Sequence, residues 1–129
     1  MDYTISKTLH KSFNEATDLV IDELKKEGFG IITEVNLKEK FKEKLGVDFR
    51  NYKILGACNP AIANKAVQIE DKIGVMLPCN ILVQEKENGD VEISAINPVK
   101  TIGVVNNRNL DPIAIEVSEK LKKAIDKVS

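Results

Sequence analysis

The chain has 129 residues but only one histidine, two cysteines and no tryptophan. So few nitrogen and sulfur ligands argue against a four-ligand zinc site within a single chain. Aromatic residues make up 5% of the sequence, which leaves few rings to stack on nucleic-acid bases. The 19 basic and 20 acidic residues nearly cancel, so charge favours neither nucleic acid nor an anionic membrane as a partner.

The short motifs of several enzyme classes are also missing. The sequence has no glycine-rich phosphate-binding motif, no H-E-x-x-H of zinc hydrolases and no G-x-S-x-G of serine hydrolases. His10 falls between an expected strand and an expected helix, and we interpret it as a surface or capping residue instead of the partner of a cysteine. Whether the protein is an enzyme stays open, and no cofactor is indicated.

Neither a secretory signal nor a membrane-spanning segment is expected. Residues 1–4 provide no basic and apolar leader. The most apolar stretch, 73–83, is interrupted by glycine, proline and asparagine and is far shorter than the roughly 20 residues that a spanning helix needs. We therefore expect a cytoplasmic protein in which Cys58 and Cys79 are free thiols.

Apolar periodicity predicts the element order β-α-β-α-β-α-β-β-α. The expected strands are 2–9, 29–35, 52–57, 79–87 and 90–97. The expected helices begin at the capping residues Ser12, Asn36, Asn59 and Asp111. Gly28 and Gly46 are expected to end the first two helices. The third helix is expected to carry an apolar stripe of Ile62, Ala66, Ile69 and Ile73.

The last two strands form the clearest hairpin in the sequence. A two-residue Asn-Gly turn would mix the two faces of the hairpin and oppose like charges. A three-residue loop over 87–89, with Gly89 left-handed, instead pairs Ile81 with Ala95 and Val83 with Ile93. We therefore predict the three-residue loop.

This hairpin requires antiparallel pairing, which argues against a wholly parallel sheet. Apolar residues at 43% supply a core, and no repeat or linker-like segment divides the chain. We therefore expect one α+β domain over residues 1–129, with helices packed on one face of a mostly antiparallel sheet.

Two short segments, 56–60 and 77–80, carry the candidate binding residues Cys58, Asn59, Cys79 and Asn80. Cys58 precedes an expected helix, whose free N–H groups and dipole can stabilise a thiolate or hold an anion. The amide of Asn80 could orient a ligand. The structural alternative also stands, in which Asn59 is only a helix cap and the prolines only begin a helix and break a strand.

Cys79 has the same strand parity as Ile81 and Val83, so we expect it to point into the core. Whether its sulfur approaches Cys58 depends on the strand order. Two neighbouring thiols would make a redox pair or a soft-metal site worth testing. A metal would then need further ligands from a second subunit.

The sequence resembles the family called domain of unknown function 302. The resemblance is carried by residues 52–60 (YKILGACNP), Ala63, 73–74 (IG), 77–83 (LPCNILV), the hairpin turn and 97–98 (NP). It implies an α+β fold like one repeat of the TATA-binding-protein fold and a homodimer, without DNA binding and without an assigned reaction. The shared motif positions are Cys58, Asn59, Pro60, Pro78, Cys79 and Asn80, while Met76 and Ile81 are conservative departures.

Three functions remain open at this point. We favour a homodimer that binds a small ligand or ion near the two cysteine segments. The second is a structural or partner-binding module without a site. The third is a thiol-dependent redox protein in which Cys58 is the nucleophile.

Overall fold

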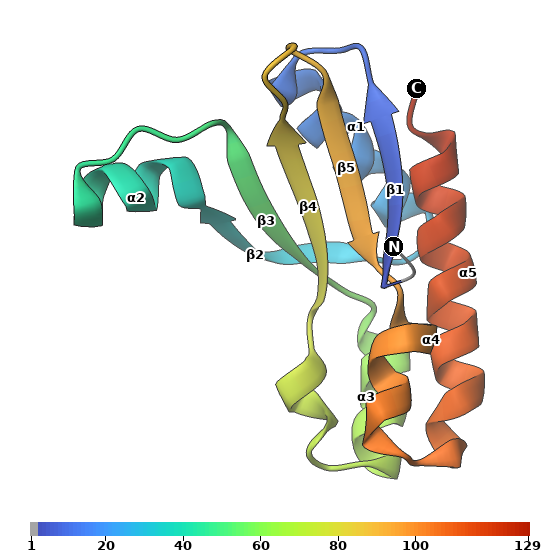
Figure 1. Ribbon diagram of the computed structural model, residues 1–129. Helices are drawn as coiled ribbons and strands as arrows, with labels where there is room; N and C mark the ends of the chain where they lie inside the picture. Colours follow the sequence, from blue (N-terminus) through green and yellow to red (C-terminus); the bar gives the residue numbers. More distant parts are fainter. Residues whose placement is uncertain (1–2) are drawn as a thin grey trace.

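The computed structural model describes residues 3–129, so Asp2, where the first strand is expected to begin, lies outside the described residues. Five strands form one antiparallel sheet in the order β1-β5-β4-β3-β2 (Figure 1). The strands are β1 (Thr4–Leu9), β2 (Gly30–Asn36), β3 (Tyr52–Cys58), β4 (Cys79–Glu85) and β5 (Val91–Ile96). The expected α+β class is confirmed, and every strand pairing is antiparallel.

In residues 3–129, five helices accompany the sheet. They are α1 (Phe13–Lys26), α2 (Leu37–Leu45), α3 (Pro60–Ile69), α4 (Pro98–Thr101) and α5 (Asp111–Lys127). Three short 3₁₀ turns cover Ile73–Met76, Ile102–Val105 and Arg108–Leu110. Helices α3 and α4 lie beyond the end of the sheet where β3 finishes and β4 begins, and α2 extends away from the body on an arm (Figure 1).

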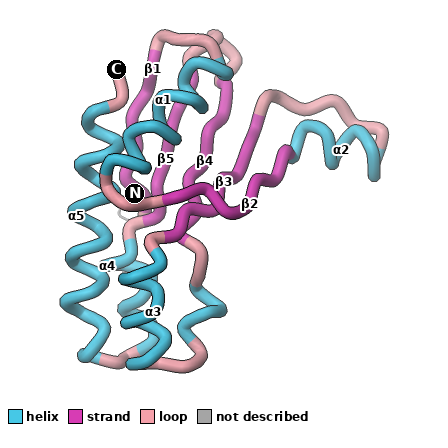
Figure 2. Tube along the Cα trace, turned by 180° about the vertical axis from the view of Figure 1, so that it is seen from behind, coloured by secondary structure: helices cyan, strands magenta, loops and turns pink. Residues whose placement is uncertain are grey.

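Helices α1 and α5 cover one face of the sheet, as Figure 2 shows from behind. On this face Leu55, Ile81, Val83 and Ile93 are fully buried and pack in the core. The alternate residues of the same strands point to the opposite face, which no helix of residues 3–129 covers. We refer to this second side as the open face.

The predicted hairpin loop is confirmed. Val83 pairs with Ile93 and Ile81 with Ala95. The N–H of Lys86 donates to the carbonyl of Asp90 at 2.7 Å, and Gly89 adopts φ +89°. That left-handed conformation closes the three-residue loop, and the register keeps the apolar side of both strands against α1.

Three of the predicted helix caps are also confirmed. The side chains of Ser12, Asn36 and Asn59 each accept the backbone N–H of the residue three positions further on, at 3.1, 3.1 and 3.3 Å. Gly28 and Gly46 follow α1 and α2 with φ values of +87° and +65°. These local hydrogen bonds explain why the helix boundaries could be placed from the sequence.

The prediction for the end of α3 was wrong. The helix stops at Ile69, which is 37% exposed, and Glu70 is extended at φ −141°. Ile73 is buried, but it reaches the core from a separate 3₁₀ turn. Helical spacing therefore correctly predicted that Ile73 is buried, but it wrongly assigned Ile73 to α3. A pattern of buried positions does not show where a helix ends.

The predicted cap of α5 was also wrong. Asp111 is the first residue of the helix, and Pro112 follows it within the first turn. The preceding residue, Leu110, is buried at the end of a 3₁₀ turn that runs directly into α5, and it forms no side-chain cap. A side-chain cap is instead found earlier, where Asn107 accepts the N–H of Asn109 at 3.1 Å.

Candidate functional site

The two cysteines lie at the end of the sheet where β3 leaves it and β4 enters it. Ala57 pairs with Cys79, and Cys58 is the next residue along β3 and the last in the strand. Both thiols are free and half-buried, and both border one cavity of about 260 Å³. The strand order therefore brings together two segments that the sequence alone could not place relative to each other.

Almost the whole wall of this cavity, which we call the cysteine cavity, is hydrocarbon. Helices α3 and α5, the ends of β3 and β4 and the turn after α4 contribute to it. The apolar lining residues are Phe29, Ile32, Ala57, Ile62, Ala63, Ala66, Leu77, Pro78, Ile102, Ile113 and Val117. Cys58, Asn59 and Cys79 complete the wall, so a ligand inside would meet two thiols and one amide in otherwise apolar surroundings.

Asn59 is held in place from two sides. Its side-chain oxygen accepts the N–H of Ile62 at the start of α3. Its amide nitrogen lies against Gly28, where an added Cβ would come within 2.8 Å of it. The oxygen of Asn59 is therefore engaged as a helix cap, which supports the structural interpretation of this residue and leaves the cavity few polar groups.

Gly56 is a constrained position at this end of the sheet that we did not single out from the sequence. A Cβ at Gly56 would lie 2.0 Å from Oγ1 of Thr33 and 2.7 Å from Cγ of Pro78. Thr33 follows an irregularity in the β2–β3 pairing, and Pro78 enters β4 after a cis peptide bond with Leu77. A glycine inside a strand was the available sequence indication that another group approaches closely.

Ile32 is a second residue that sequence reasoning missed. It lies at the irregularity in β2, is 61% exposed and contributes to the cavity wall. An apolar side chain exposed to this degree beside a cavity lies at its rim. Nothing local in the sequence distinguishes Ile32 from its neighbour Ile31. Ile32 falls outside the β2–β3 pairing only because the register shifts between Ile31 and Thr33.

Cys79 behaves as a buried thiol. Burial raises the pKa of Cys79 to about 11, and the negative charge that a Cys58 thiolate would carry nearby adds to the increase. Cys79 shares its face of the sheet with Ile81 and packs against the core, as its parity predicted. At neutral pH it is therefore a protonated, apolar part of the cavity wall.

Asn80 does not lie with the other three candidate residues. It pairs with Gly56 on the open face, is exposed and borders a different hollow. Cys79 lines the cysteine cavity, whereas Asn80, the next residue of β4, points to the opposite face of the sheet. The structure thus gathers Cys58, Asn59 and Cys79 and separates Asn80 from them.

Comparison with known proteins places this geometry in a family. Residues 5–128 match the family described as Domain of unknown function DUF302. The chain belongs to this family. It is similar to a crystal structure of an uncharacterized conserved DUF302 protein from Bacillus stearothermophilus, with a TM-score of 0.92 and 28% sequence identity over 100% of both chains. Among curated proteins, the search finds no match.

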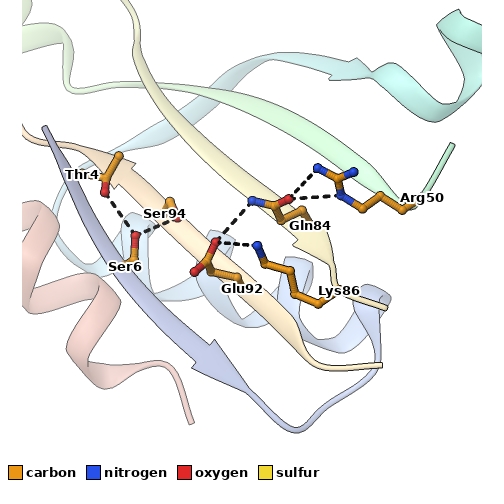
Figure 3. Close-up of polar contacts among 7 residues, drawn as sticks. All are labelled: Thr4, Ser6, Arg50, Gln84, Lys86, Glu92 and Ser94. Carbon is orange, nitrogen blue, oxygen red and sulfur yellow. Dashed lines mark hydrogen bonds and ion pairs between the residues drawn. The ribbon is translucent and has the colours of Figure 1, made fainter. Parts of the chain in front are cut away.

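The open face of this DUF302 chain carries a network of paired polar side chains (Figure 3). Arg50 donates twice to the oxygen of Gln84, at 3.0 and 3.2 Å, and the amide nitrogen of Gln84 donates to Glu92 at 3.2 Å. Lys86 forms an ion pair with Glu92 at 3.6 Å. The charges on this face are therefore largely satisfied by one another.

The remaining titratable residues do not extend the cysteine site of the DUF302 chain. His10 is 84% exposed and lies 2.7 Å from Asp90 at the hairpin loop, at the opposite end of β4 from Cys79. Within residues 3–129, no group of three or more His, Cys, Asp or Glu side chains could hold a metal ion. In the same residues, none of the helices combines the length and apolarity needed to cross a bilayer.

Proposed function

We propose that this DUF302 protein binds a small, neutral, largely apolar molecule in the cysteine cavity. The observation that carries the proposal is a cavity of about 260 Å³ with a hydrocarbon wall and two thiols. An apolar cavity of about 150 Å³ is enough to hold benzene, and ligand pockets commonly begin near about 300 Å³. The expected ligand is therefore at the small end of the usual range.

A charged ligand fits this wall less well. Moving an ion out of water is costly unless opposite charges or several hydrogen bonds replace its hydration. Among the described residues, the side chains that line the cavity include no carboxylate, ammonium or guanidinium group. The oxygen of Asn59 is already used as a cap. Of the ligand and ion considered from the sequence, the ligand has the better support.

Filling the cavity tests the proposal. Ala63 lines the cavity, while Ala61 lies on the exposed side of the same helix. Ala63→Leu should abolish binding of small apolar probes such as benzene or indole, and Ala61→Leu should leave it unchanged. Isothermal titration and thermal-shift measurements with these probes, using phosphate and acetate as charged comparisons, provide the readout. Equal binding by both variants, or no probe binding by the natural protein, would overturn the proposal.

We further propose that a second copy of the chain covers the open face. The supporting observation is that Ile54 and Leu82, which pair on β3 and β4, form a half-buried aliphatic row there, with Ile96 of β5 diagonally beside Leu82. No helix in residues 3–129 covers this row (Figures 1 and 2). The paired polar residues around the row resemble the rim of a protein interface. Helix α2, with Leu45 69% exposed, extends beyond the body and provides further contact area (Figure 1).

Oligomeric state tests this second proposal. Leu82→Glu places a charge in the middle of the row and should convert a dimer to a monomer in sedimentation equilibrium. Val75→Glu is the matched control, because Val75 is an exposed valine on a 3₁₀ turn away from the open face. A natural protein that sediments as a monomer, or a dimer unaffected by Leu82→Glu, contradicts the proposal.

A further inference from the structure

The two cysteines lie on neighbouring strands at a backbone separation that suits a disulfide bond. Cys58 is one residue out of register with Cys79 on the neighbouring antiparallel strand. Strand spacing and residue rise put the Cα atoms of such a pair roughly 6 Å apart. Disulfides usually join Cα atoms about 4.4–6.8 Å apart.

A disulfide bond also requires the two cysteine side chains to point toward each other, which a regular sheet would not allow. Strand alternation would turn Cys58 and Cys79 to opposite faces. Here Cys58 is the last residue of β3, where the chain turns at Asn59 into α3, and Cys79 is the first residue of β4. Both side chains consequently border the same cavity. The β3–β4 ladder ends at the Ala57–Cys79 pair, so Cys58 is not held in register by β4.

We propose that Cys58 and Cys79 form a reversible intramolecular disulfide when the protein meets a hydroperoxide, and that this bond alters the wall of the cysteine cavity. The sulfur of Cys58 attacks the peroxide and takes one oxygen, which gives a sulfenic acid and releases an alcohol, or water from hydrogen peroxide. The sulfur of Cys79 then attacks that of Cys58, and the displaced hydroxide leaves with the Cys79 proton as water. Two thiols and one hydroperoxide thus give one disulfide, one alcohol and one water.

The surroundings of the two thiols assign different steps to them. Cys58 is the last residue of β3 and lies one residue before the N-cap of α3, at the end of the strand and not in its middle. Cys79 packs against the core and remains a thiol at neutral pH because burial raises its pKa. Cys58 is therefore the attacking residue, and Cys79 is the residue that resolves the sulfenic acid.

The first half of this inference does not depend on the proposed ligand, whereas the second half rests on it. Both sulfur atoms border the cavity, so joining them fixes two side chains that a bound molecule would otherwise contact. We expect the oxidised protein to bind the apolar probes several-fold more weakly than the reduced protein. A reductant such as dithiothreitol should restore the original affinity.

Mass spectrometry after treatment with hydrogen peroxide tests the disulfide itself. The natural protein should lose the mass of two hydrogens, yield a linked peptide of the two cysteines and revert with dithiothreitol. In Cys79→Ser the sulfenic acid should persist on Cys58 and be trapped by dimedone, while in Cys58→Ser the remaining thiol should react far more slowly. Cys58 oxidised to sulfinic acid beside an intact Cys79 thiol, a disulfide only between two chains, or no reaction would each overturn the proposal.

The two proposals fail in distinguishable ways. A reduced protein that binds no probe but still forms the internal disulfide removes the proposed ligand and keeps the thiol pair. A protein that binds probes when reduced but forms no internal disulfide keeps the ligand and removes the thiol pair. Internal disulfide formation that leaves probe affinity unchanged overturns the coupling between them.

Discussion

The cysteine cavity and the hollow on the open face, which we call the groove, share strands β3 and β4 and have opposite chemistry. The cavity is walled by hydrocarbon and two thiols, with a volume of about 260 Å³. The groove on the open face is larger, about 760 Å³, and contains Gln84, Glu92 and Ser94. Ala57 and Cys79 line the cavity, and Asn80, the next residue of β4 after Cys79, lines the groove.

The difference in polarity between the groove and the cavity indicates which kind of partner each of them suits. In the groove the polar groups already bond to one another, as the Ser6–Ser94 contact of 2.8 Å and the Gln84 contacts show. A small polar ligand there would have to compete with existing hydrogen bonds. In the cavity an apolar ligand displaces no protein hydrogen bond. The apolar cavity therefore suits a small molecule, and the open face suits a broad protein surface.

The largest change in stability that we expect from any substitution tested here comes from Gly56, which lies in β3. Gly56→Ala should lower the free energy of unfolding by about 2–3 kcal/mol, because the new methyl group must displace both the side chain of Thr33 and the ring of Pro78. Urea denaturation measures the change. Replacing Thr33 by alanine in the same chain should recover part of the loss.

Gly30→Ala is the control for that substitution. Gly30 lies in the adjacent strand β2, and a Cβ there would have no heavy atom within 4 Å. Its replacement should change stability by no more than about 0.5 kcal/mol. If both alanine variants are equally stable, the close approach at Gly56 does not constrain this end of the sheet.

The parts of the structure that sequence reasoning reached are those decided by nearby residues. The loop at Gly89, the caps at Ser12 and Asn59 and the inward direction of Cys79 each depend on contacts or parity within a few positions. The same parity also directs Asn80 away from the cavity. We grouped Asn80 with the cysteines because the two lie in one motif, although alternation already separated them.

What could not be predicted depends on groups that are distant in the sequence. The order β1-β5-β4-β3-β2 decides that Cys58 meets Cys79, and no local pattern encodes it. The cavity also needs Ile102 and Ile113, from the turn after α4 and from α5, to converge on the start of α3. The break after Ile69 likewise depends on how the chain returns to bury Ile73.

On the cavity side, we expect a rise in pH to lower the free energy of unfolding, by no more than Gly56→Ala does. Burial raises the pKa of Cys79 in the folded protein to about 11 from its usual value of 9.0. Between these two values the unfolded chain loses a proton that the folded chain keeps, so folding becomes less favourable as pH increases. The stability that Cys79 provides is thus complete below pH 9.0 and is lost as pH passes about 11.

The difference between the natural protein and Cys79→Ala isolates this effect, because lysines and tyrosines that titrate in the same range are common to both. Urea denaturation should show the natural protein losing up to about 2–3 kcal/mol more than the variant over that interval. Cys58→Ala should keep most of the loss, since burial of Cys79 is its larger cause. Parallel pH profiles for the natural protein and Cys79→Ala would mean that the thiol is hydrated in the folded state. The contrast between an apolar cavity and a polar open face would then fail at Cys79, which lines the cavity.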